Sequence, residues 1–320
     1  MLSRVAENLY WMARYLERAE NTARLINSTT QVLLDLPRGA SFGWDLLLKA
    51  VGLDNLYAQH HSQADEAGIM RFLIADPKNP GSLLASIQHA RENARTFREV
   101  LPMEVWERIN GLYLYIRDNA ERATQGRSRR YEVLKDVIER RQSIIGLLQG
   151  SMSRDLAYQF IELGLNLERA DMTTRILDVN SAVRLPEGAA GHTARQRLWM
   201  NTLNALSAYQ MYRQHLGVHV EEAEVVAFLL KDPHFPRTVA FCLNELENCL
   251  SVLINPQQPL RAARHAWQQL VGLNLGAQPA RLHDALDQIQ QDLNELHKAI
   301  TQQYFHLHNQ APLMEQSLAQ

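Results

Sequence analysis

Apolar residues recur every three or four positions along the chain, which is the spacing of one face of an α-helix. Near the start this stripe consists of Leu9, Met12, Leu16, Ala19, Ala23 and Ile26. Its counterpart in the second half consists of Phe160, Leu163, Leu167, Ala170, Thr174 and Leu177. The pattern predicts an all-α protein without β-strands. Further helices are expected over 42–61, 65–75, 81–101, 103–125 and 130–149, with a corresponding set in the second half.

Both stripes are interrupted by the same charged sequence. The run LERAENTARLI covers residues 16–26, and LERADMTTRIL covers residues 167–177. A later motif, Phe-Leu-x-x-Asp-Pro-x-x-Pro, also occurs twice and ends at Pro80 and at Pro236, where each proline suits the first turn of the next helix. We interpret these repeats as an internal duplication. The expected architecture is two tandem helical bundles, 1–152 and 153–320, packed together about a pseudo-twofold axis.

Four charged positions recur in the two copies of the first motif. They are Glu17, Arg18, Glu20 and Arg24 in the first copy and Glu168, Arg169, Asp171 and Arg175 in the second. Glu20 and Arg24 have the acid-first i,i+4 spacing that favours an ion pair within one helix, as do Asp171 and Arg175. On a helical wheel Glu17 lies on the same flank as Glu20 and Arg24, whereas Arg18 points to a different side.

The recurring charges allow two interpretations. In the structural one, they form internal salt bridges that hold the two long helices together. In the functional one, the helices cross near the pseudo-twofold axis and bring two Glu-Arg pairs into one site. Arginines there would hold a substrate carboxylate or phosphate, or a paired carboxylate would act as a base. The Glu-Arg dipeptides at 107–108, 121–122 and 139–140 have no duplicated context and add no support.

Composition narrows the class of protein. The net charge of −2 over 320 residues argues against nucleic-acid binding, because binding to a phosphate backbone needs a clustered positive excess. The five lysines among the 33 basic residues are Lys49, Lys78, Lys135, Lys231 and Lys298. This preference for arginine favours internal ion pairs, although genomic base composition produces the same bias. No apolar segment reaches the roughly 18 residues of a membrane span, and the start of the chain lacks a signal pattern, so we expect a cytoplasmic protein.

Motifs for familiar chemistry are missing from the sequence. Cys242 and Cys249 lie about 10 Å apart by helical rise, too far for a disulfide, so we expect them to be core residues. His215 and His219 have an i,i+4 spacing, but the first half has no equivalent of His219, so we predict no metal site. A glycine-rich phosphate loop and a G-x-S-x-G elbow are both absent. We therefore expect no cofactor. If the function of this chain requires ATP, we expect another protein to bind and hydrolyse it.

Four runs of the sequence resemble the bacterial alpha-E family, which is named for a predicted all-helical domain with a Glu-Arg motif. They are MLSRVAENLYWMARYLERAENTARLI, DPKNPGSLLASIQHARENARTFR, LERADMTTRIL and DPHFPRTVAFCLNELE. The resemblance covers essentially the whole chain. Members are typically encoded beside a circularly permuted ATP-grasp ligase, and often near a transglutaminase-like protein or a proteasome-like peptidase. The resemblance thus implies a part in making or modifying peptide or amide bonds.

Two functions follow as hypotheses. The first is an accessory or scaffold subunit of an ATP-grasp-associated system, contacting the ligase or its peptide substrate and not acting as an enzyme on its own. The alternative is an enzyme that acts on a peptide or small molecule through the paired Glu-Arg clusters. The lack of nucleophile, metal and nucleotide motifs in the sequence favours the first.

Overall fold

The computed structural model describes residues 3–35, 43–181, 183, 185, 188–273 and 279–305, which form α-helices without any β-strand. The first half contains α1 (Ser3–Asp35), α2 (Asp45–Ala50), α3 (Asp54–His60), α4 (Glu66–Ile74), α5 (Leu83–Thr96), a 3₁₀ turn (Arg98–Val100), α6 (Met103–Thr124) and α7 (Arg127–Ser151). The second half contains α8 (Leu156–Ser181), α9 (Ala189–Ala205), α10 (Tyr209–Leu216), α11 (Glu222–Lys231), α12 (Val239–Ser251), α13 (Gln257–Gly272) and α14 (Pro279–Tyr304). The all-α prediction is confirmed. None of the described helices is both long enough and apolar enough to cross a lipid bilayer.

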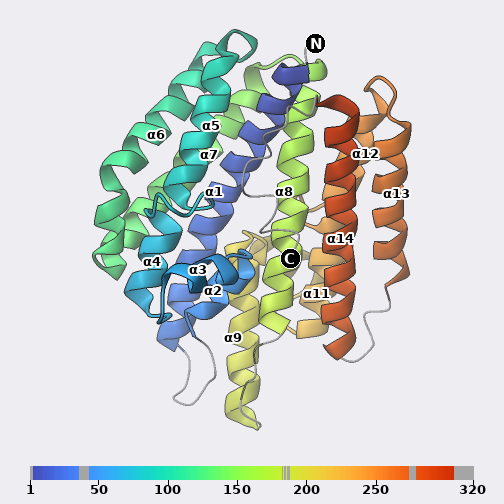
Figure 1. The fold of residues 1–320 in the computed structure, drawn as a ribbon. Coiled ribbons are helices and arrows are strands. Elements are labelled where there is room, and N and C mark those ends of the chain that lie inside the picture. Colours follow the sequence, from blue (N-terminus) through green and yellow to red (C-terminus); the bar gives the residue numbers. More distant parts are fainter. Residues whose placement is uncertain are drawn as a thin grey trace.

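The long helices α1 and α8 lie side by side at the centre of the molecule (Figure 1). Helices α5, α6 and α7 cover one side of this pair, and α12, α13 and α14 cover the other. The two central helices approach closely at Gly164 of α8. A Cβ atom there would overlap the backbone carbonyl oxygen of Tyr10 in α1, so only glycine fits. This close approach lets charged side chains reach from one central helix to the other.

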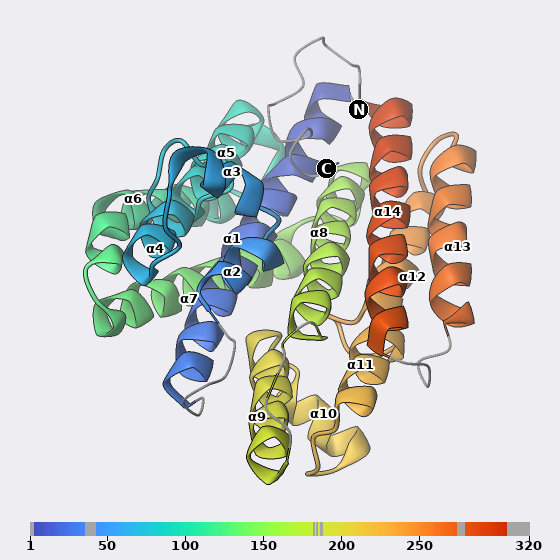
Figure 2. The same cartoon turned by 60° about the horizontal axis from the view of Figure 1, so that its bottom comes forward.

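Helices α9 and α2 connect the two halves further. Helix α9 packs along α1, and α2 packs mainly against α8, so each of these helices covers the central helix of the other half. Figure 2 shows α9 beside the ends of α1 and α8. Buried apolar residues from helices of both halves form one connected core. The expected boundary at 152/153 falls in the loop between α7 and α8, while the internal duplication and its pseudo-twofold axis stay predictions.

The single helix expected over 42–61 is wrong, because the described part of this range forms two short helices, α2 and α3. The chain turns between them at Gly52, whose φ is 68°. Glycine adopts this left-handed conformation without the steric cost that other residues incur. The amide of Gly52 donates to the carbonyl oxygen of Lys49 at 3.0 Å, which ends α2. The helix expected over 81–101 is also shorter than predicted, since α5 ends at Thr96.

The two repeated prolines lie before the helices and not in their first turns. Helix α5 begins three residues after Pro80, and α12 begins three residues after Pro236. The cap of α5 is Ser82, whose hydroxyl accepts a hydrogen bond from the amide of Ala85 at 3.2 Å. Thr238 caps α12 in the same way. Capping hydroxyls satisfy amide groups that otherwise lack a partner in the first turn, and this fixes where each helix starts.

Both cysteines lie in α12 and are free and buried, in agreement with the expectation that they are core residues. Burial raises the pKa of each thiol to about 12. A thiol with such a pKa is almost entirely protonated at neutral pH and is a poor nucleophile.

Candidate functional site

A cluster of buried charges lies where α1 and α8 meet. Glu17 of α1 is fully buried, and arginines from three other parts of the fold surround its carboxylate. Arg169 of α8 donates to both of its oxygens at 3.2 and 3.3 Å. Arg237, just before α12, donates at 2.9 Å, and Arg141 of α7 donates to Oε2. Glu17 therefore joins α1, α7, α8 and the segment before α12 at a single carboxylate.

Glu20 lies one turn further along α1 and has the same kind of environment. Its Oε1 accepts from Arg24 Nε at 2.7 Å and from Arg237 Nη2 at 2.8 Å, and its Oε2 accepts from Arg141 Nη1. The expected i,i+4 pair of Glu20 and Arg24 is present. Arg141 and Arg237 each bridge Glu17 and Glu20, so the two carboxylates and their arginines form one network.

The second helix supplies a similar arrangement around Glu168. Its carboxylate accepts from Arg18 at 2.5 and 3.0 Å and from Arg14 at 2.7 Å, and both arginines lie on α1. The contacts between α1 and α8 are thus reciprocal, because the arginine of each Glu-Arg dipeptide binds the glutamate of the other. Asp171 and Arg175 form the expected i,i+4 pair at 2.8 Å.

The sequence-predicted charges are therefore brought together and paired. The side chains of Glu17 and Glu20 are 0% exposed, that of Glu168 is 2% exposed, and those of Arg18 and Arg169 are each 11% exposed. Isolated charges at such depth would be too costly to bury, so pairing is a condition for the folded state.

Positive charge exceeds negative charge throughout the cluster. Glu17 and Glu20 face four arginines, which are Arg24, Arg141, Arg169 and Arg237. Glu168 and Asp171 face three, which are Arg14, Arg18 and Arg175. Burial lowers the pKa of Arg237, and repulsion from Arg169 and Arg141 acts in the same direction against the pull of the two glutamates. The cluster around Glu17 and Glu20, which we call the arginine-rich cluster, thus holds a buried positive excess.

Two buried donors near this cluster lack an acceptor among the described residues. They are Nε of Arg141 and Nδ2 of Asn21, whose residues are each 2% exposed. The Oδ1 of Asn21 accepts from Arg237 at 3.0 Å, so its amide nitrogen is directed elsewhere. Buried donors without partners are uncommon in folded proteins and call for an explanation. Together with the positive excess, they indicate that the arginine-rich cluster has capacity for a further anion.

The arginines keep the buried carboxylates ionised. Burial by itself would raise the pKa of Glu168, but the attraction of Arg18 and Arg14 outweighs it and lowers the pKa to about 2. The same competition, with Arg141 and Arg237 as partners, holds the pKa values of Glu17 and Glu20 below their usual range. A general base works best when its pKa lies near the operating pH. These carboxylates are therefore poorly suited to accept a proton at neutral pH.

This shift predicts a pH dependence of stability. The unfolded chain binds a proton at Glu168 near pH 4.5, whereas the folded chain does so only near pH 2. The stabilisation from this carboxylate is complete above the unfolded pKa and is lost as the pH falls through the folded pKa. We expect Glu168→Gln to reduce the slope of the unfolding free energy against pH in this window, measured by urea denaturation. The exposed Glu107→Gln is the control, and a Glu168→Gln slope equal to that of the wild type would contradict the assignment.

Three members of the network were not predicted from the sequence. They are Arg14, Arg141 and Arg237, and none of them belongs to the charged positions that recur in the two motifs. In the other copy, Leu165 stands at the position of Arg14 and Gly81 at the position of Arg237. One signal was available for Arg141. It falls within the apolar stripe of α7, whose buried positions include Leu134, Val137, Ile144 and Leu148. An arginine at a core position of a helix indicates a buried ion pair.

One group of side chains in the described part of the chain has the composition of a metal site. It consists of Asp178 in α8 and His283 and Asp287 in α14. Nδ1 of His283 lies 2.6 Å from Asp178, and its Nε2 lies 3.6 Å from Asp287. The hydrogen bond to Asp178 raises the pKa of His283. A ring with a hydrogen-bonded carboxylate at one nitrogen and a second carboxylate near the other is stabilised as an imidazolium, so this geometry favours an ion-paired triad over a metal site.

Comparison with known proteins places the chain in a family. It is similar to uncharacterized proteins of Mycobacterium bovis and of Mycobacterium tuberculosis, with 27% identity over 272 residues in each case. The match covers 76% of this chain but spans only 29% of the length of these curated relatives. No solved structure matches the chain. A family model described as "a predicted alpha-helical domain with a conserved ER motif" matches residues 1–305, and the chain therefore belongs to the Alpha-E family.

Proposed function

We propose that this chain is a helical accessory subunit, or scaffold, of an ATP-dependent system that forms or modifies peptide or amide bonds. The observation that carries the proposal is the pairing of the Glu-Arg dipeptides across α1 and α8. Their carboxylates are buried, ionised and bound by two or more arginines each. Such groups hold two helices in a fixed relation, and their low pKa values make them weak proton acceptors. This arrangement supports a rigid binding body more than a catalytic one.

The comparisons support a part within a larger assembly. In the mycobacterial relatives the matching segment lies within a chain of which it occupies 29%. The segment there is covalently joined to other polypeptide, which suits a domain that works together with further domains. The family resemblance adds the class of partner, an ATP-grasp ligase, with a transglutaminase-like protein or a proteasome-like peptidase as further candidates.

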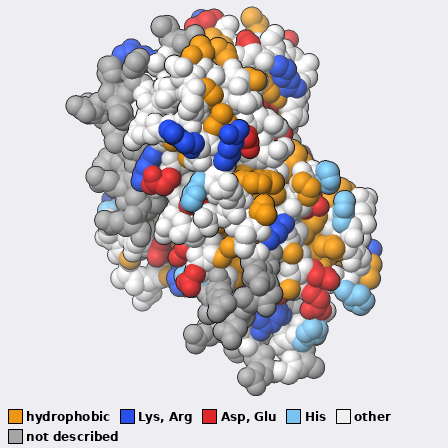
Figure 3. All heavy atoms as spheres, turned by 90° about the vertical axis from the view of Figure 1, so that its right-hand side faces the viewer, with side chains coloured by type: hydrophobic (Ala, Val, Ile, Leu, Met, Phe, Trp, Pro, Cys, Tyr) orange, Lys and Arg blue, Asp and Glu red, His pale blue; other side chains and the backbone are white. Residues whose placement is uncertain are grey.

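The surface offers places for such a partner to dock. Val252 and Ile254, in the connection between α12 and α13, are 59% and 72% exposed, and Val271 at the end of α13 is 58% exposed. Figure 3 shows the face on the side of α13, where hydrophobic side chains gather across the middle with charged groups scattered around them. Apolar side chains in the core of an interface contribute much of its stability. A stable contact with a ligase would bury roughly 1,200–2,000 Å² in total.

The proposal predicts that the isolated chain neither binds nor hydrolyses ATP. Calorimetry with ATP and magnesium is expected to give no heat of binding, because the sequence has no glycine-rich loop that would hold the phosphates. Mixing with the neighbouring ATP-grasp ligase is expected to shift the elution of this chain in size-exclusion chromatography. ATP turnover by the ligase, measured with and without this chain, then tests whether the contact has a functional effect.

The alternative, an enzyme that acts through the Glu-Arg clusters, makes the opposite prediction. Micromolar ATP binding by the purified chain that is lost on Arg24→Ala or Arg175→Ala would overturn the scaffold proposal. Both arginines pair with an acid four residues earlier, and their side chains are 12% and 17% exposed. They are therefore the cluster members that an anionic ligand would reach most directly.

A further inference from the structure

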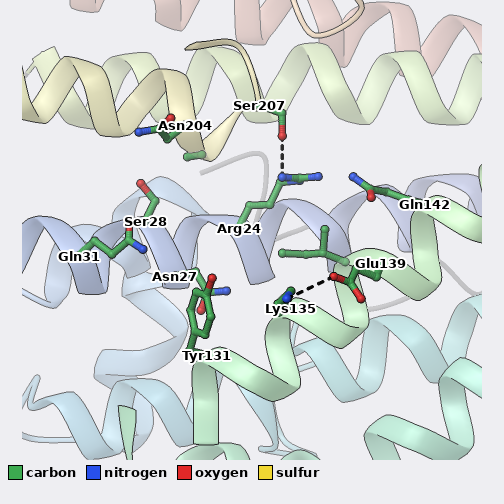
Figure 4. Close-up of a pocket in the computed structure, with 12 residues that line it drawn as sticks. Arg24, Asn27, Ser28, Gln31, Tyr131, Lys135, Glu139, Gln142, Asn204 and Ser207 are labelled. Carbon is green, nitrogen blue, oxygen red and sulfur yellow. Dashed lines mark hydrogen bonds and ion pairs between the residues drawn. The ribbon is translucent and has the colours of Figure 1, made fainter. Parts of the chain in front are cut away.

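A polar pocket opens beside the arginine-rich cluster. It has a volume of about 340 Å³ and lies between α1, α7 and the turn that joins α9 to α10. This is within the usual range for sites that bind small molecules. Figure 4 shows Arg24 at its centre, with the guanidinium group between Ser207 and Gln142. The pocket brings together residues from both halves of the chain.

Arg24 is held so that its Nη2 group remains for a ligand. Its Nε binds Glu20 at 2.7 Å, and its Nη1 donates to Ser207 Oγ at 2.7 Å. Ser207 has a φ of 54°, a left-handed conformation that a non-glycine residue rarely adopts, and this places its hydroxyl against Arg24. The Nη2 group of Arg24 has no hydrogen-bond partner among the described residues. A guanidinium fixed by two bonds loses little entropy when it binds an anion.

The charge around the pocket favours an anion. Arg24 belongs to the arginine-rich cluster, where four guanidinium groups face two carboxylates. Lys135 and Glu139 also line the pocket and pair with each other at 3.7 Å, so they leave the local excess unchanged. An anion bound at Arg24 would offset a positive charge that the protein itself does not neutralise.

The rest of the lining suits an amide. The side-chain amides of Asn27, Gln31, Gln142 and Asn204 line the pocket, and none forms a hydrogen bond with another described residue. Each offers both a donor and an acceptor, which is the complement of a peptide group. The ring of Tyr131, which is 49% exposed, provides a flat apolar surface at the same site.

We propose that this pocket binds the carboxyl group at the end of a peptide, with Arg24 as the partner of the carboxylate. The side-chain amides hold the adjoining peptide bond. The proposal rests on the proposed function and deepens it, because it names a carboxylate-bearing peptide as the substrate class that the accessory subunit presents. Charge-assisted hydrogen bonds to a guanidinium give both affinity and orientation to a carboxylate.

The test uses calorimetry on the full chain alone, with N-acetyl-dialanine and its C-terminal amide as probes. The free acid is expected to bind at least about tenfold more tightly than the amide, since only the acid makes the charged contact. Arg24→Gln is expected to weaken binding of the free acid by a similar factor. Gln142→Ala, at an exposed position outside the ion-pair network, is expected to weaken binding without affecting folding. Arg129→Gln, which alters an exposed arginine of α7 outside the pocket, is the matched control and is expected to bind as the wild type does.

Several results would overturn the proposal. They are equal binding of acid and amide, tighter binding of inorganic phosphate than of N-acetyl-dialanine, wild-type affinity in both Arg24→Gln and Gln142→Ala, or no heat with any probe at millimolar concentration. Because the ligase is absent from this measurement, failure here leaves complex formation with the ligase as a separate result.

Discussion

Glu17→Ala is expected to lower the free energy of unfolding by about 3–5 kcal/mol, the typical loss when one partner of a buried ion pair is removed. The substitution deletes the carboxylate that binds Arg141, Arg169 and Arg237. Glu20 would remain as the partner of Arg141 and Arg237, and Arg169 would keep no ion pair among the described residues. All three arginine side chains are at most 11% exposed, so the loss of their partner is costly. Urea denaturation followed by circular dichroism would measure the loss, because the protein is helical.

The matched control is Glu107→Ala on α6. Glu107 also precedes an arginine, but it is exposed and forms no ion pair among the described residues, so its replacement should change stability by less than about 0.5 kcal/mol. Glu17→Gln keeps the size of the side chain and should retain most of the loss, since the charge is still missing. If Glu17→Ala unfolded at the same urea concentration as the wild type, the cluster would not have the structural role assigned to it.

The second large effect is expected from Gly164→Ala. The added methyl group would overlap the carbonyl oxygen of Tyr10, and backbone cannot move aside as the end of a flexible side chain can. Helices α1 and α8 would have to separate, which would also stretch the ion pair between Arg18 and Glu168. Overpacking of this kind typically costs about 1–3 kcal/mol, and we expect the upper end because backbone is involved. The shift in thermal or urea unfolding measures it.

Gly146→Ala is the control for Gly164→Ala and is expected to raise the stability of the protein, because this glycine also lies inside a helix but has no close neighbour. Gly146 lies inside α7 with open space around the site of a Cβ atom. Alanine there should stabilise the protein by about 0.5–1 kcal/mol, because glycine in the interior of a helix has a larger entropy cost of folding. A Gly164→Ala variant as stable as Gly146→Ala would show that α1 and α8 do not pack as closely as described.

Much of the candidate site could be predicted from the sequence because the relevant signal is local. The i,i+4 pairs of Glu20 with Arg24 and of Asp171 with Arg175 follow from helical spacing alone, and both are present. The pocket beside Arg24 was not predicted. Its walls come from α1, α7 and the α9–α10 turn, which are far apart in the chain, and residues such as Gln31 and Asn204 carry no local pattern that brings them together.

The sequence by itself determined the all-helical class, since a spacing of three to four residues places apolar side chains on one face only when the backbone is helical. It also determined that each of two helices carries a Glu-Arg dipeptide at the same place in its apolar stripe, at 17–18 and at 168–169. Only the tertiary structure decided which glutamate meets which arginine. Arg18 binds Glu168 and Arg169 binds Glu17 because α1 and α8 approach closely at Gly164, a contact between residues more than a hundred positions apart. Arg141 and Arg237 enter the same cluster from α7 and from the start of α12, since each helix must bury its own apolar face against the central pair.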